Sequence, residues 1–410
     1  MTTPSNASIK PRALLLAVET PYPMIGGGPF RIACLLGYLA QHFSVHLILY
    51  HQHGVRNPGG AIPPGLVDQL DLIELPYHSK RSVARLLRTA WRLVRNRPPM
   101  FDRYSGFEAR IAALVSGQSY DVAVLEHFWN ATYVEQVRPL AGAVMLDLHN
   151  VESAWHYSMA ASANPIAAAA FRRFGRACIA LERTWLPQFD AILTTSSDDA
   201  AIIQPMTRAR LSVFPNALPE MPLPPRPEKC EIVFSGNLEY PPNVAAVRYF
   251  FHQVWPALRT RWPELKWKIL GRSPQSITGM VSRDSRILVT GAVKEAVPLL
   301  AESQIAVVPL LAGSGTRIKI LEAWAAGTPV VSTTLGAEGL ECRDQEHLLL
   351  ADDPAAFEKA VSRLLASAED RARIGMAGRR LYEERYCWPA AWQALDAVFG
   401  EVSRTSRSTL

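Results

Sequence analysis

The chain has 410 residues, 49% hydrophobic and 20% charged, with a formal net charge of +6 and a pI near 9.1. This composition excludes disordered and fibrous proteins, and the length predicts two domains of roughly 200 residues each. The five cysteines are odd in number and never at metal-ligand spacing, which favours a reducing cytosol. No apolar run is long enough for a spanning helix, and Met1–Arg12 is too polar for a secretory signal.

The N-terminal stretch predicts a strand, a glycine loop and a helix. Ala13–Val18 is an apolar run, Gly26, Gly27 and Gly28 follow, and a helix is expected from about Pro29 to His42. This unit has the form of a phosphate-facing Rossmann turn, because glycine lets the backbone approach a ligand closely. It is not a dinucleotide fingerprint, since the spacing differs from G-x-G-x-x-G and the strand Val45–Tyr50 is followed by no acid.

Metal ligands are not predicted. His46, His51 and His53 lie at the second strand and its end, and without partner carboxylates they are expected to be surface histidines. The pairs Asp198–Asp199 and Asp352–Asp353 stand at polar helix starts, where capping explains them. No divalent ion and no other cofactor is therefore expected.

The basic residues are concentrated in one amphipathic helix, expected at about residues 82–95. Its arginines alternate with Val83, Leu86, Leu87, Trp91 and Val94. Two interpretations stay open: the apolar face packs on the sheet and the arginines face water, or the helix docks on an anionic membrane surface. Because the charge is local, no nucleic-acid partner is predicted.

Polar residues follow two later strands of the first half. The runs Tyr120–Glu126 and Gly142–Leu146 predict buried strands, which lead into His127 and into the stretch Asp147–Asn150. Open α/β sheets bind ligands at the carboxyl ends of their strands. His149 is therefore a candidate site residue, with a turn-capping histidine as the alternative.

A proline-rich segment divides the chain. Residues 217–226 read ALPEMPLPPR, which predicts a semi-rigid linker. We expect an N-terminal domain at 1–216, a linker at 217–228 and a C-terminal domain at 229–386. Strands and helices alternate again in the second half, which predicts a second parallel sheet with right-handed crossovers.

The stretch from Gly313 to Gly339 predicts an anion site. Gly313, Ser314, Gly315 and Thr316 precede a helix, and free N–H groups at a helix N-terminus favour phosphate. Arg317 and Lys319 add positive charge there, and Glu322, about one turn later, could accept hydrogen bonds from sugar hydroxyls. The alternative is an ordinary glycine-led helix.

The whole pattern resembles the donor-site signature of retaining glycosyltransferases of family four, in particular the branch of exopolysaccharide sugar transferases. The matching residues are Gly313, Gly315, Thr316, Arg317, Lys319, Leu321, Glu322, Ala323, Gly327, Pro329, Val330 and Val331. Gly26–Arg31 and the stretch from His149 to Ser153 also match. Most of the family carries two glutamates with seven residues between them; Glu322 stands at the second of these positions here, but Ser314 stands at the first.

The resemblance implies the GT-B fold, with two Rossmann-like parallel-sheet domains facing each other across a cleft. The second would bind a nucleotide-sugar donor and the first a saccharide or lipid-linked acceptor, with transfer retaining the anomeric configuration. A final helix at about 387–402 would return to the first domain. The implied catalytic residues are His149, Arg317, Lys319 and Glu322. The implied donor-binding residues are Gly27, Gly28, Asn237, Gly271, Val293, Gly313, Ser314, Gly315 and Thr316.

Two other classes of function stay open. A nucleotide-sugar epimerase or a phosphorylase could use the same double fold, and a non-catalytic nucleotide-sugar binding subunit would tolerate the missing first glutamate. The sequence features together predict a cytoplasmic enzyme of polysaccharide or glycoconjugate synthesis, at the inner face of the cell membrane if helix 82–95 docks there.

Overall fold

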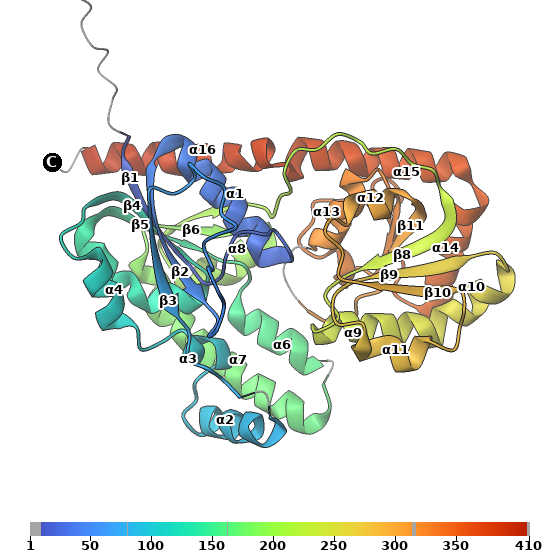
Figure 1. The fold of residues 1–410 in the computed structure, drawn as a ribbon, viewed down its shortest axis with the longest axis horizontal. Coiled ribbons are helices and arrows are strands. Elements are labelled where there is room, and N and C mark those ends of the chain that lie inside the picture. Colours follow the sequence, from blue (N-terminus) through green and yellow to red (C-terminus); the bar gives the residue numbers. More distant parts are fainter. Residues whose placement is uncertain (1–9, 80, 162, 314–316, 408–410) are drawn as a thin grey trace, which may run out of the picture. The chain divides into compact units, whose positions relative to one another are not determined.

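The computed structural model describes residues 10–79, 81–161, 163–313 and 317–407. The chain divides into two compact units (Figure 1). The N-terminal unit comprises Met1–Tyr157, Ala169–Phe214 and Trp392–Leu410, and the C-terminal unit comprises Ser158–Ala168 and Pro215–Ala391. Each unit is built on a parallel β-sheet.

The sheet of the N-terminal unit has the strand order β3-β2-β1-β4-β5-β6-β7, and all its strand pairs are parallel. The central strands are aliphatic and covered on both faces, as in β1, where Leu14, Leu15 and Leu16 are fully buried. The order reverses between β1 and β4, which creates the switch point where such sheets bind ligands. The strands are β1 (Arg12–Ala17), β2 (Ser44–His51), β3 (Gln69–Glu74), β4 (Tyr120–Glu126), β5 (Ala141–Asp147), β6 (Ala191–Thr194) and β7 (Arg210–Val213).

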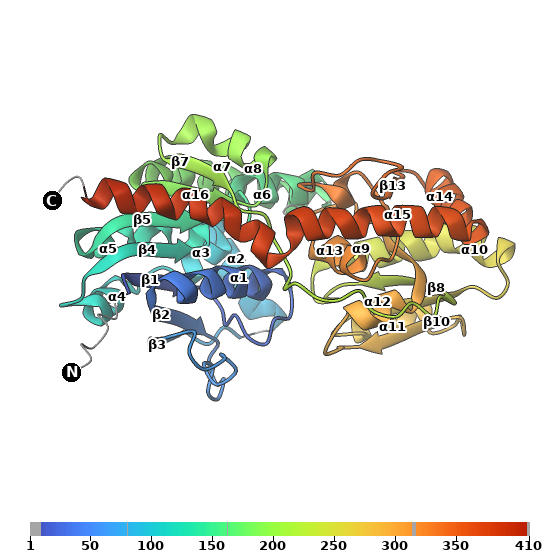
Figure 2. The same ribbon diagram turned by 90° about the horizontal axis from the view of Figure 1, so that it is seen from above.

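Helices flank this sheet, and α6, α7 and α16 each contain residues of both units. α6 ends in the C-terminal unit, α7 and α16 start there, and the N-terminal-unit part of α16 packs on α1 (Figure 2). In that contact Trp392 Nε1 donates to Cys34 O at 3.0 Å, and Tyr38 Oη donates to Asp396 Oδ1 at 2.9 Å. The helices are α1 (Gly27–His42), α2 (Ser82–Val94), α3 (Pro99–Arg103), α4 (Glu108–Val115), α5 (Val134–Val137), α6 (Glu152–Ala161), α7 (Pro165–Trp185), α8 (Ser197–Ile203) and α16 (Trp388–Arg407).

The sheet of the C-terminal unit repeats this topology with the order β10-β9-β8-β11-β12-β13, again parallel. Its switch point lies between β8 and β11. The strands are β8 (Lys229–Ser235), β9 (Lys266–Leu270), β10 (Ile287–Gly291), β11 (Ser303–Val308), β12 (Val330–Ser332) and β13 (Leu349–Leu350).

The helices of this unit include one interruption that the sequence analysis missed. A wide π-helical turn, Phe250–Val254, joins two helices before Pro256, whose missing N–H prevents regular α-helical bonding there. Among the described residues no helix has both the length and the apolar character that crossing a bilayer requires. The helices are α9 (Pro241–Tyr249), α10 (Trp255–Arg261), α11 (Gln275–Val281), α12 (Val297–Ala301), α13 (Ile318–Ala325), α14 (Pro354–Ala366) and α15 (Ala368–Leu381).

The expectation that capping explains both aspartate pairs is only partly right. Asp353 caps α14 by accepting hydrogen bonds from the N–H groups of Ala355 and Ala356. Asp352 instead accepts the N–H and hydroxyl of Thr334, both at 2.7 Å. At α8 the cap is Ser196, and it accepts from the N–H of Asp199.

Candidate active site

Two acidic side chains end neighbouring strands of the N-terminal unit. Glu126 is the last residue of β4 and Asp147 the last of β5, and the register of the sheet pairs them. Both are fully buried. Glu126 Oε2 accepts the backbone N–H of Val18 at 2.8 Å, which ties the end of β4 to the end of β1. The carboxyl edge of the sheet therefore holds two buried carboxylates that need positive partners.

Arg31 is the partner of Asp147. It lies on α1, one turn after the glycine loop, and is 1% exposed. Its Nε lies 3.0 Å from both carboxylate oxygens, and its Nη1 donates to Phe214 O at 2.7 Å. This pairing of one guanidinium with both oxygens fixes the carboxylate geometrically as well as electrostatically.

His149 is the partner of Glu126. Its Nε2 forms an ion pair with Glu126 Oε1 and lies 3.9 Å from Asp147 Oδ2. Burial by itself lowers the pKa of His149, but the two carboxylates outweigh it and the net shift is upward. The two carboxylates thus favour the charged form of His149, and that form can donate a hydrogen bond or a proton to a substrate.

His127 packs beside His149. It follows β4 with a φ of 67°, stacks on Trp129 at 3.5 Å between ring centroids, and lies 4.9 Å from the His149 ring. Burial, with the charges of His149 and Arg31, holds the pKa of His127 well below its usual value. Non-glycine residues rarely take this backbone conformation, and such strain gathers at functional sites.

The glycine loop lies next to these groups. Gly27 is the exposed first residue of α1, and Gly28 follows it. A Cβ added at Gly28 would lie 2.0 Å from Glu19 Oε1 and 3.7 Å from His149 Cε1. A larger residue than glycine would therefore require the Glu19 carboxylate to move, and the structure brings Gly28 and His149 together.

Glu322 lies at the matching edge of the C-terminal unit. It is on α13, and its Oε2 accepts a hydrogen bond from the hydroxyl of Ser235, the last residue of β8, at 3.2 Å. Burial raises the pKa of Glu322 to about 7, although Ser235 and Lys319 both act in the opposite direction. The carboxyl group is thus held at the switch point of the sheet and can change its charge near neutral pH.

Lys319 lies one turn earlier on α13. Its Nζ donates to Asn243 Oδ1 at 2.7 Å and lies 4.3 Å from the centroid of the Phe234 ring. Burial, then the charge of Arg317, lowers the pKa of Lys319 to about 7, while Glu322 acts against this shift. An incoming anion would favour the charged form of this amine.

Arg317 precedes α13 and is 7% exposed. Its guanidinium lies 3.5 Å from Glu338 Oε2 and donates to Leu335 O at 3.4 Å. Gly313, with a φ of 108°, lies beside the same guanidinium. The predicted site residues Ser314, Gly315 and Thr316 lie outside the described residues.

Three further predicted residues lie in loops after β8, β9 and β10. Asn237 turns the first loop, accepting the N–H of Glu239 through its side chain and the amide of Asn243 through its carbonyl. A Cβ at Gly271 would lie 2.0 Å from Gly236 O, so only glycine allows these two loops to meet. Val293 lies beyond Gly291, whose carbonyl accepts the N–H of Gly271 at 3.0 Å.

Sequence reasoning missed several members of both sites. Arg31, Glu126 and His127 had no assigned role, nor had Ser235 and Glu338. A signal existed for two of them: Glu126 and Ser235 are polar residues that end apolar strands at a sheet edge. Arg31 lies in the segment Gly26–Arg31 that resembles the family, but its pairing with Asp147, 116 residues away, gave no signal.

Of the three histidines at β2 and its end, His53 is exposed as expected and His46 is not. His46 is 2% exposed, not a surface residue, and it contacts Tyr120 Oη at 2.6 Å and Asp71 Oδ2 at 2.9 Å. His53 Nδ1 lies 2.7 Å from Glu74 Oε1. Both carboxylates come from β3, which pairs with β2 in parallel register. His46 and His53 therefore do have partner carboxylates. The absence of such partners was the reason for predicting no metal site at these histidines, and that reason was wrong.

The sequence relatives match part of the chain. Residues 229–367 match the family model described as Glycosyl transferases group 1. An uncharacterized 44.6 kDa protein in the cps region of Klebsiella pneumoniae is 26% identical over 165 residues, 38% of this chain and 42% of that protein. A D-inositol 3-phosphate glycosyltransferase of Salinispora tropica is 34% identical over 92 residues, 22% and 19% of the two chains. The chain thus matches less than half the length of these curated relatives.

The structural relatives match nearly all of it. Sucrose-phosphate synthase from Thermosynechococcus elongatus has a TM-score of 0.71 at 17% identity, covering 98% of this chain and 100% of the other. The Anabaena protein HepE in complex with UDP and glucose has a TM-score of 0.65 at 13% identity, covering 95% and 100%. At these identities the likeness establishes the fold. The chain therefore has the GT-B fold, as expected from its sequence, and its C-terminal unit carries the group 1 glycosyl transferase match.

Proposed function

We propose that this protein is a retaining glycosyltransferase that moves a sugar from a nucleoside diphosphate donor to a saccharide or lipid-linked acceptor. The observation that carries the proposal is the group at the start of α13, where Arg317, Lys319 and Glu322 lie at the carboxyl edge of the sheet. This group lies inside the segment that matches the glycosyl transferase family. The cps-region relative favours a role in exopolysaccharide synthesis.

The C-terminal unit is assigned to the donor. Arg317 and Lys319 would counter the charge of the diphosphate, which grows as the glycosidic bond to phosphate breaks. Glu322 would accept hydrogen bonds from the hydroxyl pair of a ribose, and its hydrogen bond to Ser235 holds the carboxylate in place. In this assignment Arg317 and Lys319 supply the positive charge, so no metal ion is needed to counter the diphosphate.

The N-terminal unit is assigned to the acceptor. His149, held in its charged form by Glu126 and Asp147, would donate a hydrogen bond to a reacting sugar. Arg31 neutralises Asp147, which leaves Glu126 as the closer partner of the imidazolium. The pairing of Arg31 with Asp147 and of His149 with Glu126 supports His149 as a hydrogen-bond donor that is held in position.

Glu322→Gln should weaken binding of a nucleoside diphosphate by about 1.5 to 3 kcal/mol, the usual worth of a hydrogen bond to a charged group. The amide keeps the shape of the side chain but cannot carry negative charge. Calorimetric titration with UDP and GDP measures the effect. Glu358→Gln, on the half-buried side of α14, is the matched control and should leave affinity unchanged. Equal affinities for Glu322→Gln and the unchanged chain would remove Glu322 from the donor site.

Helix α2 supports a second partner, an anionic membrane surface. Among the described residues of α2 none is buried, Leu93 is half-buried, and five large apolar residues are 58% to 76% exposed: Val83, Leu86, Leu87, Trp91 and Val94. The interpretation that α2 packs its leucines on the sheet is therefore wrong. α2 contacts α3 and lies away from the sheet (Figure 1).

Arginines hold α2 on the protein. Arg92 Nε pairs with Asp102 Oδ2 at 2.8 Å, Arg88 donates to Ser79 O at 2.8 Å, and Arg173 donates to Leu93 O at 2.9 Å. Arg88 and Arg92 are thus partly buried against the protein, while Leu86 and Leu87 face outward. Arg85 and Arg95 are exposed as well, and exposed apolar side chains together with exposed arginines fit a bilayer with anionic headgroups. Such docking would place the enzyme at the inner face of the cell membrane.

Vesicle flotation tests the membrane contact. With phosphatidylglycerol vesicles at low salt the protein should float, and Leu86→Ser with Trp91→Ser should reduce the floating fraction at least tenfold, because about 25 cal/mol per Å² of apolar contact is lost. Ile166→Ser, which changes an even more exposed apolar residue on α7, should float like the unchanged protein. Flotation that is absent, or equal in all three proteins, would exclude docking through α2.

A further inference from the structure

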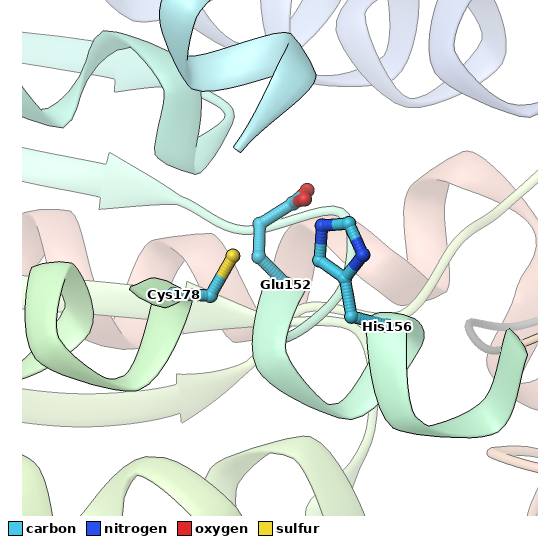
Figure 3. A group of neighbouring side chains, drawn as sticks. All are labelled: Glu152, His156 and Cys178. Carbon is cyan, nitrogen blue, oxygen red and sulfur yellow. The ribbon is translucent and has the colours of Figure 1, made fainter. Parts of the chain in front are cut away.

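Three potential metal ligands converge in the N-terminal unit, apart from the groups assigned to catalysis. Glu152 and His156 lie on α6 and Cys178 on α7, and their exposed fractions are 6%, 3% and 1%. One ligand atom from each lies within 4.8 Å of the other two. Figure 3 shows the three side chains next to one another, with Glu152 between Cys178 and His156.

The spacing along the helices explains the convergence. Glu152 and His156 are four residues apart, so both project from one face of α6. Cys178 comes from the middle of α7. The ligand set is one oxygen, one nitrogen and one sulfur, which is a combination that suits Zn²⁺ and not Mg²⁺ or Ca²⁺.

His156 has an unexplained buried nitrogen. Its Nδ1 is buried and has no hydrogen-bond partner, and its ring packs against Trp155, Phe171 and Phe174. Buried polar atoms are nearly always paired, because an unpaired one loses its hydration without compensation.

The surrounding groups orient the ligands. Trp129 Nε1 donates to Glu152 Oε1 at 2.9 Å, and His127 Nδ1 lies 3.9 Å from the same oxygen. Glu182, one turn beyond Cys178 on α7, accepts the N–H of Ser153 at 2.9 Å and its hydroxyl at 2.7 Å. In metal sites, hydrogen bonds from surrounding residues fix the orientation of the side chains that bind the metal. Glu152 and Glu182 are both buried here, and a cation would offset their negative charge.

We propose that Glu152, His156 and Cys178 bind one zinc ion, with water in a fourth position. Binding forms a zinc–sulfur bond and releases the thiol proton of Cys178 to solvent. The ion would link the first turn of α6 to α7, and so fix the turn that carries His149. The site is separate from the phosphate chemistry, for which the sequence predicts no metal.

Cobalt substitution tests the site in the full chain. Protein stripped with a chelator and given one equivalent of Co²⁺ should show the near-ultraviolet absorption of a cobalt–thiolate bond, and Zn²⁺ should displace it. Cys178→Ser and His156→Ala should each weaken Zn²⁺ binding at least tenfold. Cys34→Ser and Cys230→Ser, which replace one buried and one exposed thiol elsewhere, should keep both the spectrum and the affinity.

The unchanged protein alone can exclude the site, so the test does not depend on whether the variants fold. If the unchanged protein gives no cobalt–thiolate absorption, or retains less than about one tenth of an equivalent of Zn²⁺ after gel filtration, the site is excluded. A spectrum that is lost in Cys230→Ser and kept in Cys178→Ser would assign the metal to the protein surface and also overturn the proposal. Zn²⁺ binding should raise the Tm of the unchanged protein and leave that of Cys178→Ser unaltered.

Discussion

Lys319→Ala should lower kcat for glycosyl transfer by about 100-fold to 1000-fold while changing KM much less. The diphosphate gains negative charge as the bond to the sugar breaks, so a cation beside it stabilises the transition state more than the bound donor. The Nζ of Lys319 is already placed, through its hydrogen bond to Asn243 and its contact with Phe234. Steady-state kinetics with varied donor concentration measures both constants.

The same amine should take up a proton when a diphosphate binds. Burial and Arg317 lower the pKa of Lys319 to about 7, so near pH 7.5 most of the free protein carries a neutral amine there. An anion raises that pKa again, and the required proton comes from the buffer. Calorimetric titration with UDP in buffers of different ionisation enthalpy counts this proton.

The control for Lys319 is Lys359→Ala, an exposed lysine on α14. It should leave kcat, KM and proton uptake unchanged. A Lys319→Ala enzyme with normal kcat and raised KM would assign this residue to ground-state binding of the donor. Unaltered proton uptake in that variant would show that the proton goes elsewhere.

Arg31→Met should destabilise the N-terminal unit by about 3 to 5 kcal/mol, because it leaves the buried carboxylate of Asp147 without its partner. Arg31 also donates to Phe214 O at 2.7 Å and lies over the Phe214 ring at 4.6 Å. Hydrogen exchange in peptides from β4 and β5 measures the loss, since these strands flank the pair. Exchange there should become at least 100-fold faster, the factor that about 3 kcal/mol corresponds to.

Arg138→Met provides the comparison. Arg138 pairs with Asp190, but the side chains are 38% and 43% exposed, so water screens the pair and the expected loss is about 0 to 1 kcal/mol. If both variants exchange at the same rate, the buried pair contributes no more than a surface pair. The position of Glu126 and His149 would then not depend on Arg31.

The sequence predicted the sheets well because their strands are apolar runs. The run Tyr120–Glu126 was predicted with its observed bounds, and the strand at Val45–Tyr50 was one residue short at each end. Helix α6 was missed, since Glu152, Ser153 and His156 lie on its buried face and break the apolar periodicity. The π-helical turn before Pro256 also has no periodic signal.

The sites were predictable to the extent that they lie on one element. Arg317, Lys319 and Glu322 are close in sequence, and one helix start brings them together. The pairs Arg31–Asp147 and His149–Glu126 join residues from different strands and helices, so sheet order and register determine them. The outward apolar face of α2 depends in the same way on Asp102 and Ser79, which no helical periodicity reveals.

The central claim is tested most directly by following donor and acceptor together. The protein is incubated with UDP-sugars and GDP-sugars, with and without a lipid-linked saccharide acceptor, and mass spectrometry and NMR identify the products. We predict that one donor releases its nucleoside diphosphate only when the acceptor is present, and that the new linkage keeps the anomeric configuration of the donor. Conversion of the donor sugar without acceptor, inversion in the product, or binding of the donor with no turnover of any pair would contradict the account.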